Sequence, residues 1–450
     1  MRILAILAVS AAVLSAQPAS FEGDWTGTLD AGAMKLRIGL NVKSQDGKVS
    51  AAFDSIDQGA FGIPLDSVTI EQNRIRFSKQ SLALSYDGLL NGGRIEGTFT
   101  QAGQHFPLTF ERGKPKAAAR PQYPTAPFPY DSEEVTVASG EVKLAGTFTH
   151  PKQGGPFAAI LLVTGSGPQD RDETVFNQKP FLVISDFLTR AGYAVLRLDD
   201  RGTAKSTGDF SAAGLPEFTG DALASVAWLK ARPDVKRIGI LGHSEGGMVG
   251  PLAAVRSDDI AFVIMLAGPA QPFDELLAEQ SEGLMRAAGA AESTIQESLE
   301  IQRQVIAILR QEPDRVKARE RLRQVAADQK AKNPQLAAQF EAGSARLLTP
   351  EILSAFAYSP AETLAKLRCP VLALFGGKDL QVPADSNLRA AAAAFTAGHV
   401  ASFTLVKLSG LNHLFQTAKT GNITEYAQSE ETISPRALDT IAAWLRMNVQ

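Results

Sequence analysis

Short runs that are almost wholly apolar recur through the second part of the chain, and they constrain its fold more than any other feature. The runs are FAAILLVTG (157–165), YAVLRLDD (193–200), RIGILGH (237–243), AFVIMLAG (261–268) and PVLALFGG (370–377). Strands that are apolar on both faces suit a parallel sheet buried between helices. Helix-like stretches separate the runs, at 180–191, 216–231, 245–256, 384–397 and 435–448. This alternation predicts an α/β domain over residues 131–450, with a mostly parallel sheet and helices on both of its faces.

One interval departs from this alternation of strands and helices. Between residues 268 and 370 the chain is far longer than a single connecting helix requires. The interval is rich in Ala, Leu, Glu, Gln and Arg, and its apolar side chains recur at helical spacing, at Ile295, Leu299, Val305, Ile306 and Leu309. Such an insertion is either packing around the core or a cap over a binding pocket. Because it follows a strand at the carboxyl side of the sheet, we favour a helical cap at about 271–360.

The first 16 residues, MRILAILAVSAAVLSA, are typical of a secretory signal peptide. Arg2 supplies an early positive charge, and an apolar run that is too short to cross a bilayer comfortably precedes small residues. The alternative is a buried N-terminal strand, which neither alternation nor a turn supports. We therefore expect an exported protein, periplasmic or secreted, without an integral membrane segment once the leader is cleaved.

Two further segments precede the α/β domain. Residues 21–112 contain short alternating stretches separated by turns such as Asn91-Gly92-Gly93, which predicts a small β-barrel or sandwich of roughly eight strands. Residues 113–130 hold five prolines. Because proline lacks a backbone donor and fixes φ, this stretch is expected to be a stiff, extended linker.

Composition narrows the classes of partner and chemistry. Apolar residues make up 44% of the chain and the net charge is −3, so a large core is allowed and no basic surface for nucleic acid is indicated. Cys369 is the single cysteine, which excludes an intrachain disulfide, and it is expected to be a small buried residue. No His/Cys spacing suits zinc. We expect neither a metal nor a cofactor, while the oligomeric state stays open.

The sequence LGHSEGG (241–247) carries the main functional indication. An apolar strand leads directly into Gly242-His243-Ser244-Glu245-Gly246, and a helical stretch follows. This is the G-x-S-x-G pattern between a strand and a helix, where a serine is held on a sharp turn as a nucleophile. The alternative is an ordinary glycine-rich turn. The flanking strand and helix favour Ser244 as the nucleophile.

A serine hydroxyl needs a general base near neutral pH. The chain has five histidines, at positions 105, 150, 243, 399 and 413. His243 adjoins Ser244 and should be directed away from it by the turn. His413 follows the last apolar strand, VASFTLVKL, and so stands at the carboxyl edge of the sheet where the serine is expected. We therefore predict His413 as the base.

The base in turn needs an acid that holds its tautomer. Asp379 lies just past the strand PVLALFGG, again at the carboxyl edge. Asp385 is the nearest competitor, but it is placed to begin and cap the next helix. The resulting order, Ser244, Asp379, His413, is that of the α/β-hydrolases.

The negative charge that develops on the substrate oxygen needs two hydrogen-bond donors. One is predicted to be the backbone N–H of Glu245. The other should come from the loop 164–168, from Ser166 or Gly167, and we favour Ser166. In the loop 198–209, LDDRGTAKSTGD, Arg201 is expected to form a structural ion pair rather than to touch substrate.

Five blocks of the sequence, taken in order, resemble α/β-hydrolases of the EstD esterase type, within the wider serine aminopeptidase-like group. The blocks are TGSGPQDRDE, LDDRGTAKSTGDF, GHSEGG, FGGKDLQVP and NHLFQ, and the resemblance covers about 135–450. It implies an α/β-hydrolase core with a helical cap, activity on short acyl esters, no cofactor, and a triad of Ser244, Asp379 and His413. Thr164-Gly165 stands where many α/β-hydrolases have His-Gly, which leaves the oxyanion donor unassigned by the resemblance.

These observations predict a serine hydrolase that cleaves small-molecule carboxylic esters through a Ser-His-Asp triad and an acyl-enzyme. An aminopeptidase, a thioesterase or an acyltransferase could use the same triad. A peptidase would need an acidic anchor for a substrate amine, for which Glu279 and Glu282 are the candidates in the insertion. A non-catalytic binding protein is the remaining alternative, against which the intact Ser/Asp/His set argues.

Overall fold

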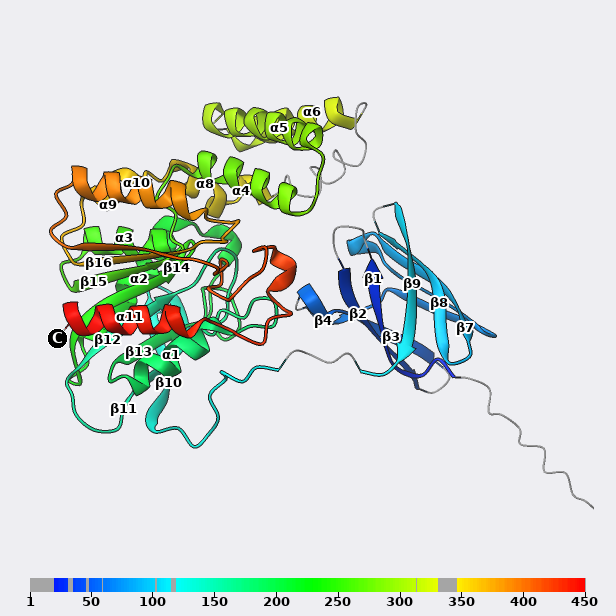
Figure 1. Cartoon of the computed structure of the whole chain (residues 1–450), viewed down its shortest axis with the longest axis horizontal. Helices are drawn as coiled ribbons and strands as arrows, with labels where there is room; N and C mark the ends of the chain where they lie inside the picture. Colours follow the sequence, from blue (N-terminus) through cyan, green and yellow to red (C-terminus); the bar gives the residue numbers. More distant parts are fainter. Residues whose placement is uncertain are drawn as a thin grey trace, which may run out of the picture. The chain divides into compact units, whose positions relative to one another are not determined.

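A computed structural model describes most of the chain, and it divides into two compact units whose main boundary falls between residues 114 and 119 (Figure 1). The described residues are 20–30, 35–45, 48–58, 60–101, 103–114, 119–312, 314–330 and 346–449. The leader predicted at 1–16 lies outside them.

The first unit is a single antiparallel sheet of nine described strands. Their bounds are β1 Gly23–Asp30, β2 Lys35–Gln45, β3 Lys48–Ser55, β4 Ala60–Pro64, β5 Ser67–Glu71, β6 Arg74–Lys79, β7 Leu84–Asn91, β8 Arg94–Gln101 and β9 Gln104–Arg112. The strand order is β4-β3-β2-β1-β9-β8-β7-β6-β5. Gly92 and Gly93 join β7 to β8 with φ of 53° and 86°, values that explain why glycine occupies both positions of this tight hairpin.

Aromatic side chains fill the interior of this sheet. Trp25, Phe99 and Phe110 are almost completely buried, and Tyr86 stacks on Phe77 with ring centroids 5.1 Å apart. The buried polar ends are satisfied, since the indole of Trp25 donates to a backbone carbonyl at 2.7 Å and the Tyr86 hydroxyl donates to another at 3.0 Å. The unit therefore has a hydrophobic core of its own.

The second unit is built on an eight-stranded sheet. Its strands are β10 Tyr130–Ser139, β11 Val142–Pro151, β12 Phe157–Val163, β13 Ala194–Leu198, β14 Val235–His243, β15 Ile260–Leu266, β16 Val371–Gly376 and β17 Phe403–Leu408. The order is β10-β11-β13-β12-β14-β15-β16-β17, and all neighbours from β13 to β17 are parallel. The central strands are buried on both faces, as their unbroken apolar sequences predict.

Helices cover both faces of this sheet. They are α1 Pro180–Arg190, α2 Leu215–Lys230, α3 Gly246–Arg256, α9 Pro360–Ala365, α10 Ala384–Ala397 and α11 Pro435–Asn448. The helices α1 and α11 pack against each other on one face, while α2, α3, α9 and α10 form a row on the other (Figure 1). Together with the separate all-β unit, this confirms the predicted fold class.

The insertion between β15 and β16 is helical. Its longer elements are α4 Phe273–Ala287, α5 Glu292–Gln311, α6 Arg315–Lys330 and α8 Pro350–Ala357. The helices α4 and α8 lie nearest to the sheet, and α5 and α6 lie farther out (Figure 1). A small core between α5 and α6 that includes Ile301, Val305 and Leu322 holds the outer pair together. Among the described residues, none of the helices is long and apolar enough to cross a membrane.

Part of the proline-rich segment is fixed to the second unit. The Arg120 guanidinium donates to the carbonyls of Ala427 and Ser429 at 2.9 and 2.6 Å. The side chain of Gln122 accepts from the Thr432 amide at 2.6 Å and donates to the Ile433 carbonyl at 2.7 Å. From residue 120 onward, therefore, the segment predicted as a linker is anchored to the loop that precedes α11.

Candidate active site

Ser244 stands on a strained turn between β14 and α3. Its φ is 52°, a left-handed value that is uncommon for serine, and its amide donates to the Leu266 carbonyl at 2.8 Å. The glycines on either side are sterically required. A methyl group at Gly242 would lie 2.0 Å from the Gly246 carbonyl oxygen, and one at Gly246 would lie 2.1 Å from the Val163 carbonyl oxygen. The G-x-S-x-G spacing thus follows from how closely the strand, turn and helix pack.

His413 and Asp379 form a buried pair that follows the ends of two neighbouring strands, β17 and β16. The His413 Nδ1 lies 2.8 Å from Asp379 Oδ2, and both side chains are almost fully inaccessible to solvent. The other carboxylate oxygen, Oδ1, accepts from the amides of Gln381 and Val382 at 2.8 and 2.9 Å. A carboxylate held in this way accepts a hydrogen bond from the Nδ1–H group, so the proton stays on Nδ1 and the unprotonated Nε2 of His413 can receive one.

The alternative acid, Asp385, has a different environment. It lies in the first turn of α10 and pairs with Lys407 at 2.7 Å, and this ammonium group lowers the pKa of the Asp385 carboxyl. Its side chain is largely exposed.

One cavity of about 570 Å³ brings Ser244 and His413 together. The loop after β12 contributes Gly165 and Ser166 to its wall, and the helical insertion contributes a mostly apolar side. The side chains from the insertion are Phe273, Leu276, Leu277, Gln280, Arg346 and Ile352. The insertion therefore covers the pocket in which the serine and the histidine lie.

The loop after β12 is held by a repeating pattern of hydrogen bonds. Alternate amides donate to carboxylates: Gly165 to Glu173 at 2.8 Å, Gly167 to Glu351 at 2.9 Å, Gln169 to Asp200 at 2.9 Å and Arg171 to Asp199 at 2.9 Å. Within the described part of the chain, the amides of Ser166 and Glu245 donate to no acceptor. Of the two sequence candidates in this loop, Gly167 is thus engaged and Ser166 is free.

Gly165 brings this loop against the nucleophile. A methyl group at Gly165 would lie 3.3 Å from Ser244 Cβ and 3.3 Å from Glu173 Oε1, tighter than ordinary packing. Glu351 comes from α8 of the insertion, so the loop is tied both to the core and to the cap. The same helix is fixed a second time, because the Leu215 amide donates to Ser354 Oγ at 2.9 Å.

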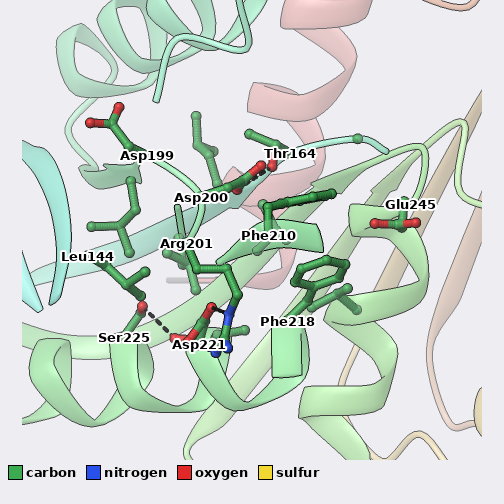
Figure 2. Close-up of a pocket in the computed structure, with 17 residues that line it drawn as sticks. Leu144, Thr164, Asp199, Asp200, Arg201, Phe210, Phe218, Asp221, Ser225 and Glu245 are labelled. Atoms are coloured by element: carbon green, nitrogen blue, oxygen red, sulfur yellow. Dashed lines mark hydrogen bonds and ion pairs between the residues drawn. The ribbon is translucent and has the colours of Figure 1, made fainter. Parts of the chain in front are cut away.

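A second, much smaller cavity of about 60 Å³ lies behind this loop (Figure 2). Thr164 Oγ1 donates to Asp200 there at 2.8 Å, and Arg201 forms a bidentate pair with Asp221 at 2.7 and 2.8 Å. The structural ion pair expected for Arg201 is therefore present. Gly165 and Glu245 line both cavities and form part of the wall between them.

Glu245 is a buried carboxyl with acidic neighbours. Burial, and then the negative charges of Glu351 and Asp200, raise its pKa to about 8, although Arg346 acts in the opposite direction. Burial likewise raises the pKa of Asp200 to about 8. Both carboxyls are thus protonated in a large fraction of molecules at neutral pH.

His243 adjoins Ser244, is buried, and lines the same cavity. Its Nδ1 lies 2.8 Å from Glu173 Oε1, and its Nε2 lies 3.0 Å from the His413 carbonyl oxygen. Burial is the largest single influence and opposes a charge on this ring, but the Glu173 carboxylate, the His413 carbonyl and Asp379 together raise the pKa of His243. The other histidines lie elsewhere: His105 bonds Thr100, His150 bonds Glu133, and His399 precedes β17.

Sequence reasoning missed two carboxylates that hold the site. Glu173 falls within the block TGSGPQDRDE, and its position eight residues after Gly165 was the available indication. Glu351 gave no indication in the sequence, because it is 184 residues from its partner Gly167.

Cys369 is partly buried, and burial raises the pKa of its thiol to about 11. Among the described residues, no group of His, Cys, Asp and Glu side chains could hold a metal ion.

The fold and the strained serine turn define an α/β-hydrolase. A family model described as X-Pro dipeptidyl-peptidase (S15 family) matches residues 139–398, more than half of the chain, and the protein belongs to this family. The chain is also similar to Esterase EstD of Thermotoga maritima, with 28% identity over 359 residues, which cover 77% of this chain and 75% of EstD. The predicted relation to EstD-type hydrolases and the prediction of a hydrolytic enzyme related to esterases are confirmed.

Solved structures resemble the chain more distantly. Est1E from Butyrivibrio proteoclasticus with bound ferulic acid has 17% identity and a TM-score of 0.45, covering 70% of this chain and 99% of its own. The Pyrococcus furiosus esterase Pf2001 also has 17% identity and a TM-score of 0.45, covering 74% of this chain and 99% of its own.

Proposed function

We propose that the protein hydrolyses small-molecule carboxylic esters, with Ser244 as nucleophile, His413 as general base and Asp379 as the acid that orients it. The observation that carries the proposal is the shared cavity: Ser244 on its strained turn and His413 with its buried Asp379 partner line the same pocket. The similarity to EstD supports an ester as the substrate class.

The reaction follows from the placement of the protons. Nε2 of His413 takes the proton of Ser244 as Oγ attacks the ester carbonyl, and Asp379 stabilises the resulting imidazolium through Nδ1. The tetrahedral intermediate collapses as His413 gives the proton to the leaving alcohol, which leaves an acyl group on Ser244. A water molecule then transfers a proton to His413 as it attacks the acyl carbonyl, and His413 gives that proton to Ser244 Oγ as the bond to the acyl group breaks and the acid leaves.

The oxyanion is proposed to bind the amides of Ser166 and Glu245. Both are free of protein acceptors in the described part of the chain, and both residues line the catalytic cavity. Fixed N–H donors in such a pocket stabilise the developing charge without reorganisation. The start of α3 directly after Glu245 adds the positive end of a helix dipole at the same place.

The acidic side chains of the cavity favour an ester over an amino-terminal peptide substrate. A peptidase that removes dipeptides would need a carboxylate free to bind the substrate ammonium group. Glu173 Oε1 is engaged by Gly165 and His243, its Oε2 is inaccessible, and Glu245 is buried beside the acidic Glu351 and Asp200. Glu279 binds Gln271 and Glu282 pairs with Arg286, and neither lines the cavity.

The test compares substrates and variants directly. The wild type should cleave p-nitrophenyl esters of short acyl chains far faster than Xaa-Pro or single amino-acid anilides, and Ser244→Ala should abolish turnover while keeping the fold. A fluorophosphonate probe should label the wild type and not Ser244→Ala. Turnover of esters by Ser244→Ala at the wild-type rate, or a preference for the anilides, would contradict the proposal.

We also propose that the protein is exported by its N-terminal leader, because residues 1–16 combine Arg2, a short apolar run and small residues. Expression of the full chain in a Gram-negative host, followed by fractionation and N-terminal sequencing, tests this. The expected result is a periplasmic or secreted protein that begins near Gln17. A cytoplasmic protein that retains Met1 would refute it.

A further inference from the structure

The histidine beside the nucleophile lies between two hydrogen-bond acceptors. His243 Nδ1 is 2.8 Å from a carboxylate oxygen of Glu173, and Nε2 is 3.0 Å from the backbone carbonyl oxygen of His413. A carbonyl oxygen only accepts, so Nε2 must carry a proton. His243 is among the buried residues of the site, and so is Glu173, with exposed fractions of 6% and 2%.

The state of the other ring nitrogen follows from what Glu173 does. Its Oε1 also accepts a hydrogen bond from the Gly165 amide at 2.8 Å. A carboxylate at Glu173 accepts from the Gly165 amide and from the His243 ring at once, and facing a carboxylate His243 Nδ1 carries a proton as well. Both nitrogens of His243 are then donors, and the ring is an imidazolium paired with an ionised Glu173.

This pair connects the three chain segments from which the proposed machinery comes. Glu173 holds Gly165, next to Ser166, whose amide is proposed to bind the oxyanion. His243 lies at the end of β14 and precedes Ser244. Through Nε2 it holds the backbone of His413, and the two imidazole rings are 4.8 Å apart. One charged side-chain pair thus fixes the loop after β12, the nucleophile strand and the loop that carries the base.

The arrangement disfavours folding locally. Glu173 has a left-handed φ of 52°, and its Oε2 is buried without a hydrogen-bond partner in the described structure. Each of these features destabilises a folded protein. Strain and an unsatisfied buried oxygen at one residue beside a catalytic pocket point to a functional requirement.

We propose that the His243–Glu173 ion pair is a positioning unit that holds the general base and the oxyanion loop in register with Ser244. The proposal rests on the function proposed above and adds two residues to it. Neither side chain touches the reacting atoms: His243 acts through the backbone of His413, and Glu173 acts through the amide of Gly165.

The first test measures the charge of the ring. In protein labelled with ¹⁵N-histidine, an imidazolium gives two similar ring nitrogen shifts, whereas a neutral ring gives two widely separated ones. The chain has five histidines, and the His243 resonances are assigned by their loss in His243→Gln. We expect the imidazolium pattern for His243 in the wild type at neutral pH, and a changed pattern in Glu173→Gln. A neutral ring in the wild type would overturn the proposal.

The second test separates positioning from stability. Active-site titration with a fluorophosphonate gives the fraction of intact sites, so kcat is expressed per titrated site. We expect His243→Gln and Glu173→Gln to lower this kcat about 10- to 100-fold with KM nearly unchanged, because displacement of catalytic groups by about 1 Å has effects of this size. Glu173→Gln keeps the shape of the side chain and covers the case in which His243→Gln does not fold.

His150→Gln is the matched control. His150 also lies between a carbonyl oxygen and a carboxylate oxygen, at 3.0 and 3.1 Å, but on β11 and away from the cavity. The kcat per titrated site of His150→Gln should equal that of the wild type. A kcat per site that stays at the wild-type value in both test variants, with only the melting temperature lowered, would refute a positioning role. Failure of the wild type to react with the fluorophosphonate would instead contradict the proposed function itself.

Discussion

The charge of Glu245 gives a prediction whose size can be worked out from the structure. This side chain is 8% exposed, and its pKa is raised from the ordinary value of 4.5 to about 8. Between pH 4.5 and about pH 8, Glu245 is protonated in the folded protein and ionised in the unfolded chain. Stability contributed by this carboxyl is therefore present at low pH and is lost as the pH rises towards 8. Glu245→Gln has a similar shape and cannot ionise, so it should not show this loss.

The expected magnitude follows from the two pKa values. One pH unit corresponds to about 1.36 kcal/mol, which gives an upper limit of about 5 kcal/mol over the whole range. Between pH 5.5 and 8.5 the free energy of unfolding of the wild type, relative to Glu245→Gln, should fall by about 3 kcal/mol. Asp200 and His243 also have shifted pKa values but are present in both proteins, so the difference between the two reports Glu245 together with its coupling to Asp200.

Urea unfolding of both proteins at several pH values between 5.5 and 8.5 measures this difference. The same substitution should also change catalysis, because a carboxylate at position 245 opposes negative charge beside its own amide. The ester kcat/KM of the wild type is expected to decline above about pH 8, and that of Glu245→Gln to decline less. A stability difference that changes by less than about 0.5 kcal/mol over the range would refute the protonated, buried carboxyl.

Three further substitutions test the geometry of the site. Gly165→Ala should lower kcat about 10-fold or more, because the added methyl group would lie 3.3 Å from Ser244 Cβ. The control is Gly220→Ala on α2, where the methyl group meets open space and full esterase activity is expected. Glu351→Ala should lower kcat about 10-fold because the Gly167 amide loses its acceptor. Glu351→Gln can still accept this hydrogen bond and should keep most of the wild-type kcat. Equal rates in the two variants would contradict this role of Glu351. Asp379→Asn should lower kcat by about 10² to 10⁴ with the melting temperature measured alongside, and a rate near wild type would exclude Asp379 as the acid.

Much of the fold could be predicted because its signals are local. The buried strands of the second unit are continuous apolar runs, and the helices between them show helical spacing, so the predicted helix at 216–231 agrees within one residue with Leu215–Lys230. The first unit has nine described strands where roughly eight were expected. The strands β4 and β5 are only five residues long and contain no fully buried side chain, so their apolar signal is weak.

The candidate site could likewise be predicted only in part from the sequence. Ser244, Asp379 and His413 each follow a recognisable strand, and parallel topology assigns all three to one edge of the sheet. The supporting residues depend on tertiary contacts that no local pattern encodes. Glu351 reaches Gly167 from the insertion, and the partners of His243 lie 70 and 170 residues away. A histidine beside a serine is ambiguous until both of its acceptors are known.

The most direct measurement of the central claim is the identity of the residue that carries the acyl group. The protein is mixed with a p-nitrophenyl ester, quenched within the first turnovers, and digested for peptide mass analysis. The account predicts an acyl group on Ser244 in the wild type, and none in His413→Ala, whose serine has no base. An adduct on another residue, or full ester turnover by His413→Ala, would contradict it.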